Sequence, residues 1–185
     1  MTTVNPLEKH ELEVRAEELD KFETMRLIVE RMQVSDFAVM NAILNSEGFL
    51  KYIGDRNIRS DDDAKAYISK TLENDNIHYW IVRLKDNNVP IGMVSFVQRD
   101  YLPCRDIGYS FLPNFTGKGY AFEAVKALLE KIPACYNVET VLAALNKDNA
   151  SSVRLVEKLG FKHQKEIEIN GNCSQLYEIC LTGGK

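Results

Sequence analysis

The sequence has few of the residues that build metal centres and disulfide frameworks. It contains 4 cysteines and 3 histidines in 185 residues. The cysteines show no C-x-x-C pair, and His10, His78 and His163 have no cysteine or carboxylate at ligand spacing. We therefore expect no metal site, and reduced thiols rather than disulfides.

Long apolar runs and an excess of positive charge are missing as well. No hydrophobic stretch approaches the length of a membrane span, and there is no internal repeat or low-complexity segment. The formal net charge of −4 argues against a general nucleic-acid binder but leaves room for a local basic patch. Because no signal peptide is recognisable, we expect a cytoplasmic protein that binds neither membrane nor nucleic acid.

What the sequence does have is a glycine turn between a strand and a helix. Residues 106–112 are a short apolar run typical of a buried strand, and residues 121–129 have apolar positions at helical spacing. Gly117 and Gly119 lie between them. A helix N-terminus has unpaired N–H groups and partial positive charge, and glycine lets an anion approach them closely. The pattern indicates a phosphate or diphosphate site, with a purely steric glycine turn as the alternative.

The residues around this turn resemble the GNAT N-acetyltransferases. The run from Asn114 to Gly119 matches the spacing of their Gln/Arg-x-x-Gly-x-Gly/Ala signature, and residues 107–124 are similar to the branch typified by RimJ and RimL. A second block, Asn149 to Phe161, resembles that branch's Asn-x-x-Ser … Glu-Lys-x-Gly-Phe. Two blocks in the same order are more specific than either alone. One departure is Asn114 itself, which replaces Gln or Arg and removes a charged side-chain contact.

The resemblance implies an α/β (α+β) fold, with a single mixed, mostly antiparallel sheet flanked by helices, the GNAT fold. The order of predicted elements agrees: strand, two helices, three strands, helix, strand, helix and two strands. We divide the chain into an N-terminal helical appendage, residues 1–22, and an acetyltransferase domain, residues 23–185. The appendage is charge-rich and can pack on the domain, pack on a partner subunit or stay exposed. Thr24-Met25-Arg26-Leu27 matches the Thr-x-Arg-Leu start of the family domain.

Hydrophobic periodicity and caps place the individual elements. Strands are expected from Thr24 to Met32, His78 to Leu84, Pro90 to Gln98, Arg105 to Leu112, Val138 to Leu145, Phe161 to Ile169 and Cys173 to Leu181. Helices are expected after Ser35-Asp36, after Ser60, after the glycines and after Asn149. The stretch from Glu47 to Arg59 is predicted as a loop with exposed aromatics, and the strands before and after the glycine helix as parallel neighbours.

The resemblance also implies acetyl-CoA as the cofactor. The diphosphate would lie at the glycines, and the pantetheine arm along residues 107–112, between that strand and the Val138–Leu145 strand, which splay apart in the family. The predicted cofactor contacts are Tyr109, Phe111, Leu112, Asn114, Gly117, Lys118, Gly119, Tyr120, Ala121, Asn149 and Ser152. For Asn149 a helix N-cap, and for Ser152 a solvated serine, are the simpler interpretations.

An amine must be neutral before it can attack a thioester carbonyl directly. An α-amine, with a pKa near 8, is partly neutral already, whereas a lysine at about 10.4 needs more help. Asp106, at the start of the cofactor strand, is the candidate base, and an exposed strand-end acid is an equally good interpretation. Glu166 and Glu168 are alternatives. A backbone N–H of the same strand would meet the developing oxyanion.

The proton for the departing thiolate has a less usual source. Many GNAT enzymes use a tyrosine that is Val156 here, and the RimJ/RimL-like branch implies Ser152 instead. Tyr109 is a candidate to line the acetyl pocket, although an aromatic residue in a sheet is more often core. We expect an acetyl-CoA-dependent N-acetyltransferase acting on a protein N-terminus or a small amine. The alternatives are a non-catalytic acyl-CoA-binding module or a generic phosphate binder, and a homodimer is left open.

Overall fold

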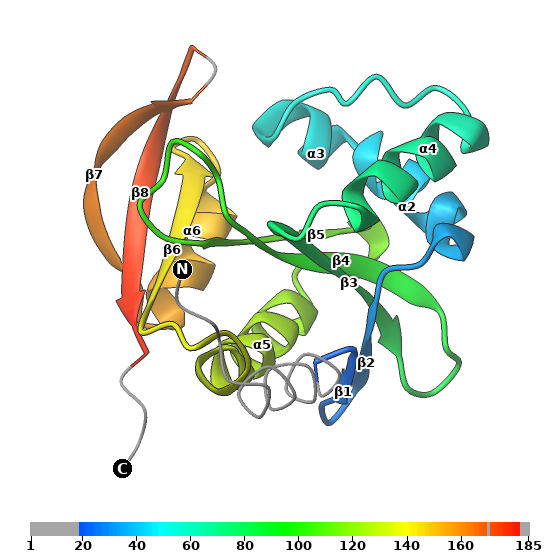
Figure 1. The fold of residues 1–185 in the computed structure, drawn as a ribbon, viewed down its shortest axis with the longest axis horizontal. Helices are drawn as coiled ribbons and strands as arrows, with labels where there is room; N and C mark the ends of the chain where they lie inside the picture. Colours follow the sequence, from blue (N-terminus) through cyan, green and yellow to red (C-terminus); the bar gives the residue numbers. More distant parts are fainter. Residues whose placement is uncertain (1–18, 170, 182–185) are drawn as a thin grey trace, which may run out of the picture.

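Eight strands form one mixed sheet in the order β1-β2-β3-β4-β5-β6-β8-β7 (Figure 1). The computed structural model describes residues 19–169 and 171–181. The strands are β1 Lys21–Glu23, β2 Leu27–Arg31, β3 Ile77–Leu84, β4 Pro90–Val97, β5 Asp106–Phe111, β6 Thr140–Asn146, β7 Lys162–Ile169 and β8 Asn172–Cys180. Only β5 and β6 pair in parallel; the other neighbours are antiparallel. The predicted fold class and the predicted parallel pair are confirmed.

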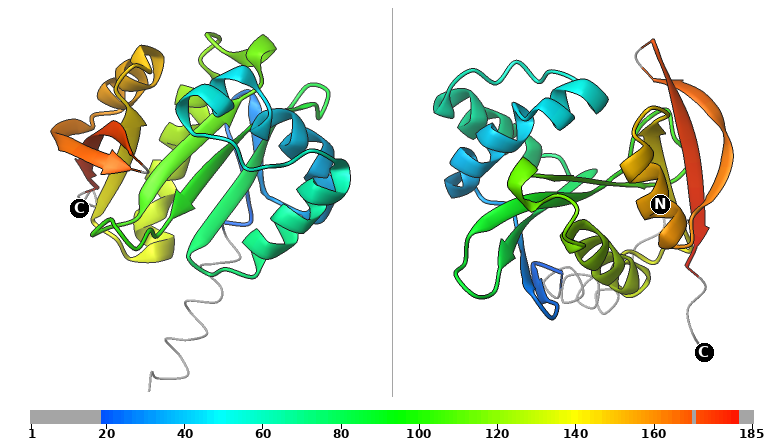
Figure 2. Two further views of the ribbon diagram at one scale, coloured as in Figure 1. Left: turned by 90° about the horizontal axis from the view of Figure 1, so that it is seen from above. Right: turned by 180° about the vertical axis from the view of Figure 1, so that it is seen from behind.

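Helices cover both faces of this sheet. The helices are α2 Phe37–Leu44, α3 Glu47–Tyr52, α4 Asp61–Leu72, α5 Tyr120–Tyr136 and α6 Ala150–Lys158. Helices α2, α3 and α4 lie on one side, and α5 lies on the other (Figures 1 and 2). In the described residues no helix is both long and apolar enough to span a bilayer.

Each face of the sheet has its own apolar core because successive side chains of a strand point in opposite directions. Trp80 and Ile81 are neighbours in β3, and both are 0% exposed. Trp80 packs in the larger core with α5 and α6, while Ile81 packs with Met93 and the helices α2 and α4. The sheet is therefore buried on both faces.

The first predicted strand is divided in the structure. A turn at residues 24–26 separates β1 from β2, and the Thr24 side chain accepts a hydrogen bond from the Leu27 amide at 3.0 Å. Met25, predicted within this strand, lies in the turn instead and is 89% exposed. The predicted appendage falls largely on residues 1–18, outside the described residues. At its end, Leu19 and Phe22 are buried in the core, and Phe22 belongs to β1.

The predicted loop from Glu47 to Arg59 is wrong in its first half, which forms α3. Ser46 caps this helix by accepting a hydrogen bond from the Phe49 amide. Phe49 is 3% exposed rather than solvent-facing, since it packs beside α2 and α4. Gly48 obscured the helix, because glycine has a low helix propensity. The Ser60 cap of α4, by contrast, is as predicted.

The half-buried imidazole of His78, on β3, makes the fold sensitive to acid. Its Nδ1 has no hydrogen-bond partner among the described residues, and its ring lies 4.9 Å from the Tyr136 ring. Burial, with additional repulsion from Arg31 and Arg105, lowers the pKa of His78 from 6.5 to about 3. Between these values the unfolded chain binds a proton that the folded chain does not. The free energy of unfolding should therefore fall as the pH drops through this range.

A His78→Phe variant should lose this part of the pH dependence, because phenylalanine keeps the ring contact and cannot be protonated. Denaturant unfolding at a series of pH values from neutral to acid measures the effect. His163→Phe is the matched control, since His163 is exposed on β7. In this variant the free energy of unfolding should depend on acid pH as it does in the wild type. If the free energy of unfolding of His78→Phe still fell with pH as in the wild type, the acid sensitivity would belong to other groups.

Candidate active site

Strands β5 and β6 separate almost as soon as they meet. Their register contains one residue pair, Asp106 with Leu142, supported by a 3.0 Å bond from the Leu142 amide to the Arg105 carbonyl. Beyond this pair, the edge of β5 that faces β6 is not paired with it. Backbone N–H and C=O groups need partners, so this edge can pair with an amide-containing ligand. The splay implied by the family resemblance is confirmed.

The glycine loop follows β5 directly and ends at the N-terminus of α5. Gly117 and Gly119 have φ values of +72° and +82°, in the left-handed region that favours glycine. A Cβ added to Gly117 would meet nothing within 4 Å, so the space beside it is open. The first N–H groups of the 17-residue α5 have no partner inside the helix. The loop therefore has the open space, the donors and the partial positive charge that suit a phosphate.

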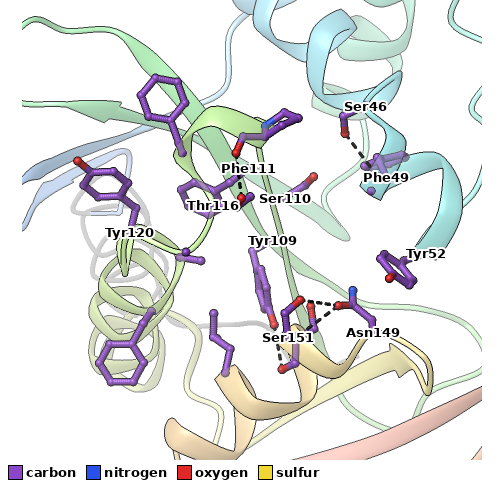
Figure 3. Close-up of a pocket in the computed structure, with 18 of the residues that line it drawn as sticks. Ser46, Phe49, Tyr52, Tyr109, Ser110, Phe111, Thr116, Tyr120, Asn149 and Ser151 are labelled. Carbon is purple, nitrogen blue, oxygen red and sulfur yellow. Dashed lines mark hydrogen bonds between the residues drawn. The ribbon is translucent and has the colours of Figure 1, made fainter.

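A pocket of about 830 Å³ joins the splayed strand to this loop. Its walls come from four places: β5, the glycine loop with the start of α5, the first turns of α6, and α3 (Figure 3). Eight of the predicted cofactor residues line it: Tyr109, Phe111, Gly117, Gly119, Tyr120, Ala121, Asn149 and Ser152. The structure thus brings together residues that are more than forty positions apart in the sequence.

Tyr109 crosses this pocket and ties β5 to α6. Its hydroxyl donates a hydrogen bond to the Ser152 carbonyl at 3.3 Å, as Figure 3 shows. Burial raises the pKa of Tyr109 to about 12, so its proton stays on the oxygen. Asn149 caps α6: its side-chain oxygen accepts from the Ser152 amide at 3.2 Å and from the Ser151 hydroxyl at 2.8 Å. The predicted N-cap is confirmed, and the cap fixes the first turn of α6 beside the pocket.

The charged side chains of the described lining are mostly cationic. Glu47 is a carboxylate, whereas Lys51, Arg154 and Lys158 carry positive charge. Arg154 and Lys158 come from α6 at i,i+4 spacing, with the Lys158 Nζ 4.5 Å from the centre of the Phe122 ring. An anionic cofactor with several phosphate groups fits such a lining, although the chain as a whole is negatively charged.

Asp106 lies on the opposite face of β5 from Tyr109 and is not part of the pocket lining. It is 3% exposed, not an exposed strand-end acid, and its Oδ1 accepts a 2.8 Å bond from the Arg99 Nε. Burial raises the pKa of the Asp106 carboxyl, and the adjacent Arg99 guanidinium opposes that rise. An elevated pKa suits a general base, but the location and the ion pair favour a structural role.

Several other predicted residues lie away from the pocket surface. Leu112 packs toward the core beneath α2 and α4, Asn114 is in an exposed 3₁₀ turn, and the Lys118 carbonyl is bonded to Arg26. The alternative bases are also elsewhere. Glu166 pairs with Gln175, and Glu168 lines a separate 380 Å³ pocket beside β7 and β8.

The helical form of α3 was missed, because the stretch from Glu47 to Arg59 was predicted as a loop. Tyr52 and Ile53 of this region face the pocket from the side opposite α5, with Tyr52 pointing toward Asn149 in Figure 3. The short helix has no motif, so only its tertiary packing could reveal it. Arg154 and Lys158 were detectable, because they follow Ser151 at helical spacing in the second family block.

These features define a class of enzyme. A parallel strand pair that opens beside a helix N-terminus, joined to it by a single pocket, is the arrangement of an acyltransferase that takes its acyl group from coenzyme A. The described residues contain no cluster of three His, Cys, Asp or Glu side chains that could hold a metal ion. They do fit acetyl-CoA, since the open glycine loop and the cationic lining complement its phosphates.

The chain belongs to the GNAT acetyltransferase family. The family model for the acetyltransferase (GNAT) domain matches residues 26–162, most of the chain. An uncharacterized N-acetyltransferase of Bacillus subtilis, YnaD, is 29% identical over 141 residues, which are 76% of this chain and 82% of that protein. The chain is therefore an N-acetyltransferase that uses acetyl-CoA.

Two solved structures share the fold at low sequence identity. Spermidine N-acetyltransferase from Vibrio cholerae, in complex with CoA and spermine, has a TM-score of 0.74 and 17% identity, covering 86% of this chain and 98% of that one. RimL, a ribosomal L7/L12 α-N-protein acetyltransferase in complex with coenzyme A, has a TM-score of 0.75 and 14% identity, covering 87% of this chain and 97% of that one. One fold thus serves two kinds of acceptor.

Substituting Gly117 by valine should weaken CoA binding by roughly tenfold, because a β-branched residue resists the left-handed conformation at a cost of about 1–2 kcal/mol. Isothermal calorimetry with CoA measures the affinity. Gly171→Val is the matched control: Gly171 has a φ of +77° and open space beside it, but lies at the β7–β8 turn. Equal CoA affinity in both variants would remove the glycine loop from the binding site.

Replacing Asp106 by asparagine tests whether this residue has a structural role or acts as the general base. If it acts structurally, the variant should lose about 2 kcal/mol of unfolding free energy, because Arg99 loses its ionic partner, while kcat of the folded enzyme stays the same. If it is the base, kcat should fall by a factor of roughly 100 or more. Denaturant unfolding and steady-state kinetics on the same preparation decide between them, and we expect the structural result.

Proposed function

We propose that this enzyme transfers the acetyl group of acetyl-CoA to the α-amine of a peptide or protein N-terminus. The observation that carries the proposal is the pocket itself, which connects the glycine loop and the open edge of β5 to a wall formed by α3. Acetyl-CoA, when bound, supplies the thioester carbonyl that the amine attacks. The protein's part is to hold the two reactants in line and to exclude water.

The charge and polarity of the lining favour this acceptor over a polyamine. Glu47 and Lys51 on α3 offset each other, and Arg154 and Lys158 on α6 are matched to the phosphates of the cofactor, so the described lining offers a multiply charged amine a single carboxylate. On the α3 side of the pocket, Phe49 is buried and Ile53 is 45% exposed, and these apolar side chains lie beside the charged pair Glu47 and Lys51. A single α-amine, already partly neutral at pH 7, suits these surroundings better than a polycation, and an uncharged small amine is the second candidate.

We assign the remaining steps to residues on the two sides of the opening. Ser152 lines the pocket at the first turn of α6, and its hydroxyl is the proposed proton relay: it gives its proton to the departing thiolate and takes up the proton that the amine releases. Tyr109 is engaged with the Ser152 carbonyl, so we assign it to lining the acetyl site rather than to proton transfer. An N–H on the open edge of β5 is the proposed oxyanion donor. Unchanged kcat in a Ser152→Ala variant would exclude Ser152 as the acid.

The branch of the family, the cellular location and the oligomeric state of this enzyme are also proposals. The second sequence block and the fold shared with RimL support a place in the RimJ/RimL-like branch. None of the four cysteines, all of them within the described residues, forms a disulfide, which is compatible with the cytosol. A homodimer remains a prediction from the sequence.

A panel of acceptors tests the proposed function. Purified enzyme, acetyl-CoA, peptides with different N-termini, spermidine, spermine and small monoamines are compared by the release of CoA thiol. We expect kcat/KM to be highest for a peptide α-amine and at least about tenfold lower for spermine, a difference of about 1.4 kcal/mol, because the described lining has one carboxylate to bind several positive charges. N-terminally blocked peptides are the control, because their lysines are the remaining amines.

Two other outcomes would change the assignment. A preference for spermine would show that the cationic lining does not govern acceptor choice. Tight CoA binding without turnover on any amine would instead favour a non-catalytic acyl-CoA-binding module on the same fold. Many family members have a tyrosine that protonates the thiolate where this chain has Val156, and this difference makes the second outcome worth testing.

A further inference from the structure

The turn between β1 and β2 reaches across the molecule to the glycine loop. Glu123, in the first turn of α5, is 18% exposed and accepts three hydrogen bonds from this turn. The Thr24 hydroxyl donates to Oε1 at 2.5 Å, the Arg26 amide to Oε1 at 2.9 Å, and the Arg26 Nε to Oε2 at 2.7 Å. Burial alone would raise the pKa of Glu123, but these bonds lower it below its ordinary value, so the carboxylate stays charged.

Arg26 also contacts the loop itself. Its Nη1 donates to the Lys118 carbonyl at 3.1 Å, and its guanidinium lies 4.5 Å from the centre of the Tyr120 ring. Its Nη2 is 3.4 Å from the position that a Cβ on Gly119 would occupy. One planar side chain therefore contacts Lys118 and Tyr120 and lies beside Gly119, at the point where the loop becomes α5.

The bond to the Lys118 carbonyl fixes the direction of the next N–H. In a trans peptide unit the C=O of one residue and the N–H of the following residue point in opposite directions. Because the Lys118 carbonyl points to Arg26, the Gly119 N–H points away from Arg26. Gly119 lines the pocket and Lys118 does not, so this is the direction in which a bound anion would need a donor.

The loop needs such an external restraint. Gly117 and Gly119, both with positive φ, have more conformational freedom to lose than other residues. The restraint is itself anchored: the Thr24 amide donates to the Leu27 carbonyl, and the Lys85 amide donates to the Arg26 carbonyl, both at 2.9 Å. Arg26 also offsets the negative charge of Glu123, which would otherwise repel an anion at the N-terminus of α5.

We infer that Thr24, Arg26 and Glu123 form a clamp that presets the glycine loop for the diphosphate of acetyl-CoA, and that Arg26 and Glu123 are positioning residues. The inference goes beyond the proposed function, which concerns the acceptor, and takes acetyl-CoA as the cofactor of the family. It gives the Thr-x-Arg-Leu segment at the start of the domain a purpose in cofactor binding. The clamp acts on affinity, because the loop pays less conformational entropy when it is already ordered.

Arg26→Met and Glu123→Gln test the clamp. Methionine keeps an apolar chain over Tyr120 but removes the donors, and glutamine removes the charge that Arg26 neutralises. Arg26→Met should bind CoA about tenfold more weakly by calorimetry, and its KM for acetyl-CoA should rise while kcat at saturation is retained. The affinity of Glu123→Gln should fall less, because the unpaired Arg26 charge then attracts the diphosphate. Amide hydrogen exchange of peptides covering residues 113–122 should become faster in both.

Glu23→Gln is the matched control. It breaks the 2.8 Å ion pair between Glu23 and Lys85 at the same turn, without a contact to the glycine loop, and should leave CoA affinity and loop exchange unchanged. Wild-type affinity in Arg26→Met, or an equal loss in Glu23→Gln, would overturn the clamp. If the wild-type enzyme binds CoA but acetylates no amine, the proposed function fails, and the calorimetry and exchange data still decide the clamp.

Discussion

Strands β5 and β6 are each firmly paired on one side and open on the other, and the active site depends on this arrangement. Strand β4 pairs with β5 through six residue pairs, and β8 pairs with β6 through seven. Between β5 and β6 there is one pair. Because both strands are already held by their outer neighbours, the sheet can tolerate an open seam at its centre. The backbone groups along this seam are the most natural partners for the amide groups of a pantetheine arm.

The seam is kept at a useful width by contacts at its two ends. At one end the Asp106–Leu142 pair closes it, with Arg99 neutralising the buried Asp106 carboxylate. Across the opening, Tyr109 bonds to the first turn of α6. The larger core contains residues of the strands on both sides of the seam, from β2 to β5 and from β6 and β8. This shared packing holds the two parts of the sheet together. The same residues that shape the pocket thus also stabilise the fold around it.

Charge is distributed to suit an anionic cofactor without making the whole protein basic. The net charge is −4, yet lysine and arginine side chains outnumber carboxylates in the described lining of the pocket. Glu123, an acid close to the anion site, is neutralised by Arg26. A negatively charged protein with a locally positive pocket concentrates its attraction for phosphates at that one place.

The sequence by itself determined the fold class, the parallel strand pair and the glycine loop, because these depend on local patterns: alternation in strands, helical spacing and glycines at a strand–helix junction. It also placed the Asn149 cap, whose bonds are to its own helix. It could not reveal α3 as a pocket wall, the burial of Asp106 beside Arg99, or the contact of Arg26 with Lys118. Arg26 and Lys118 are 92 positions apart. Contacts of that kind follow from how the sheet brings distant segments together, which only the tertiary structure decides.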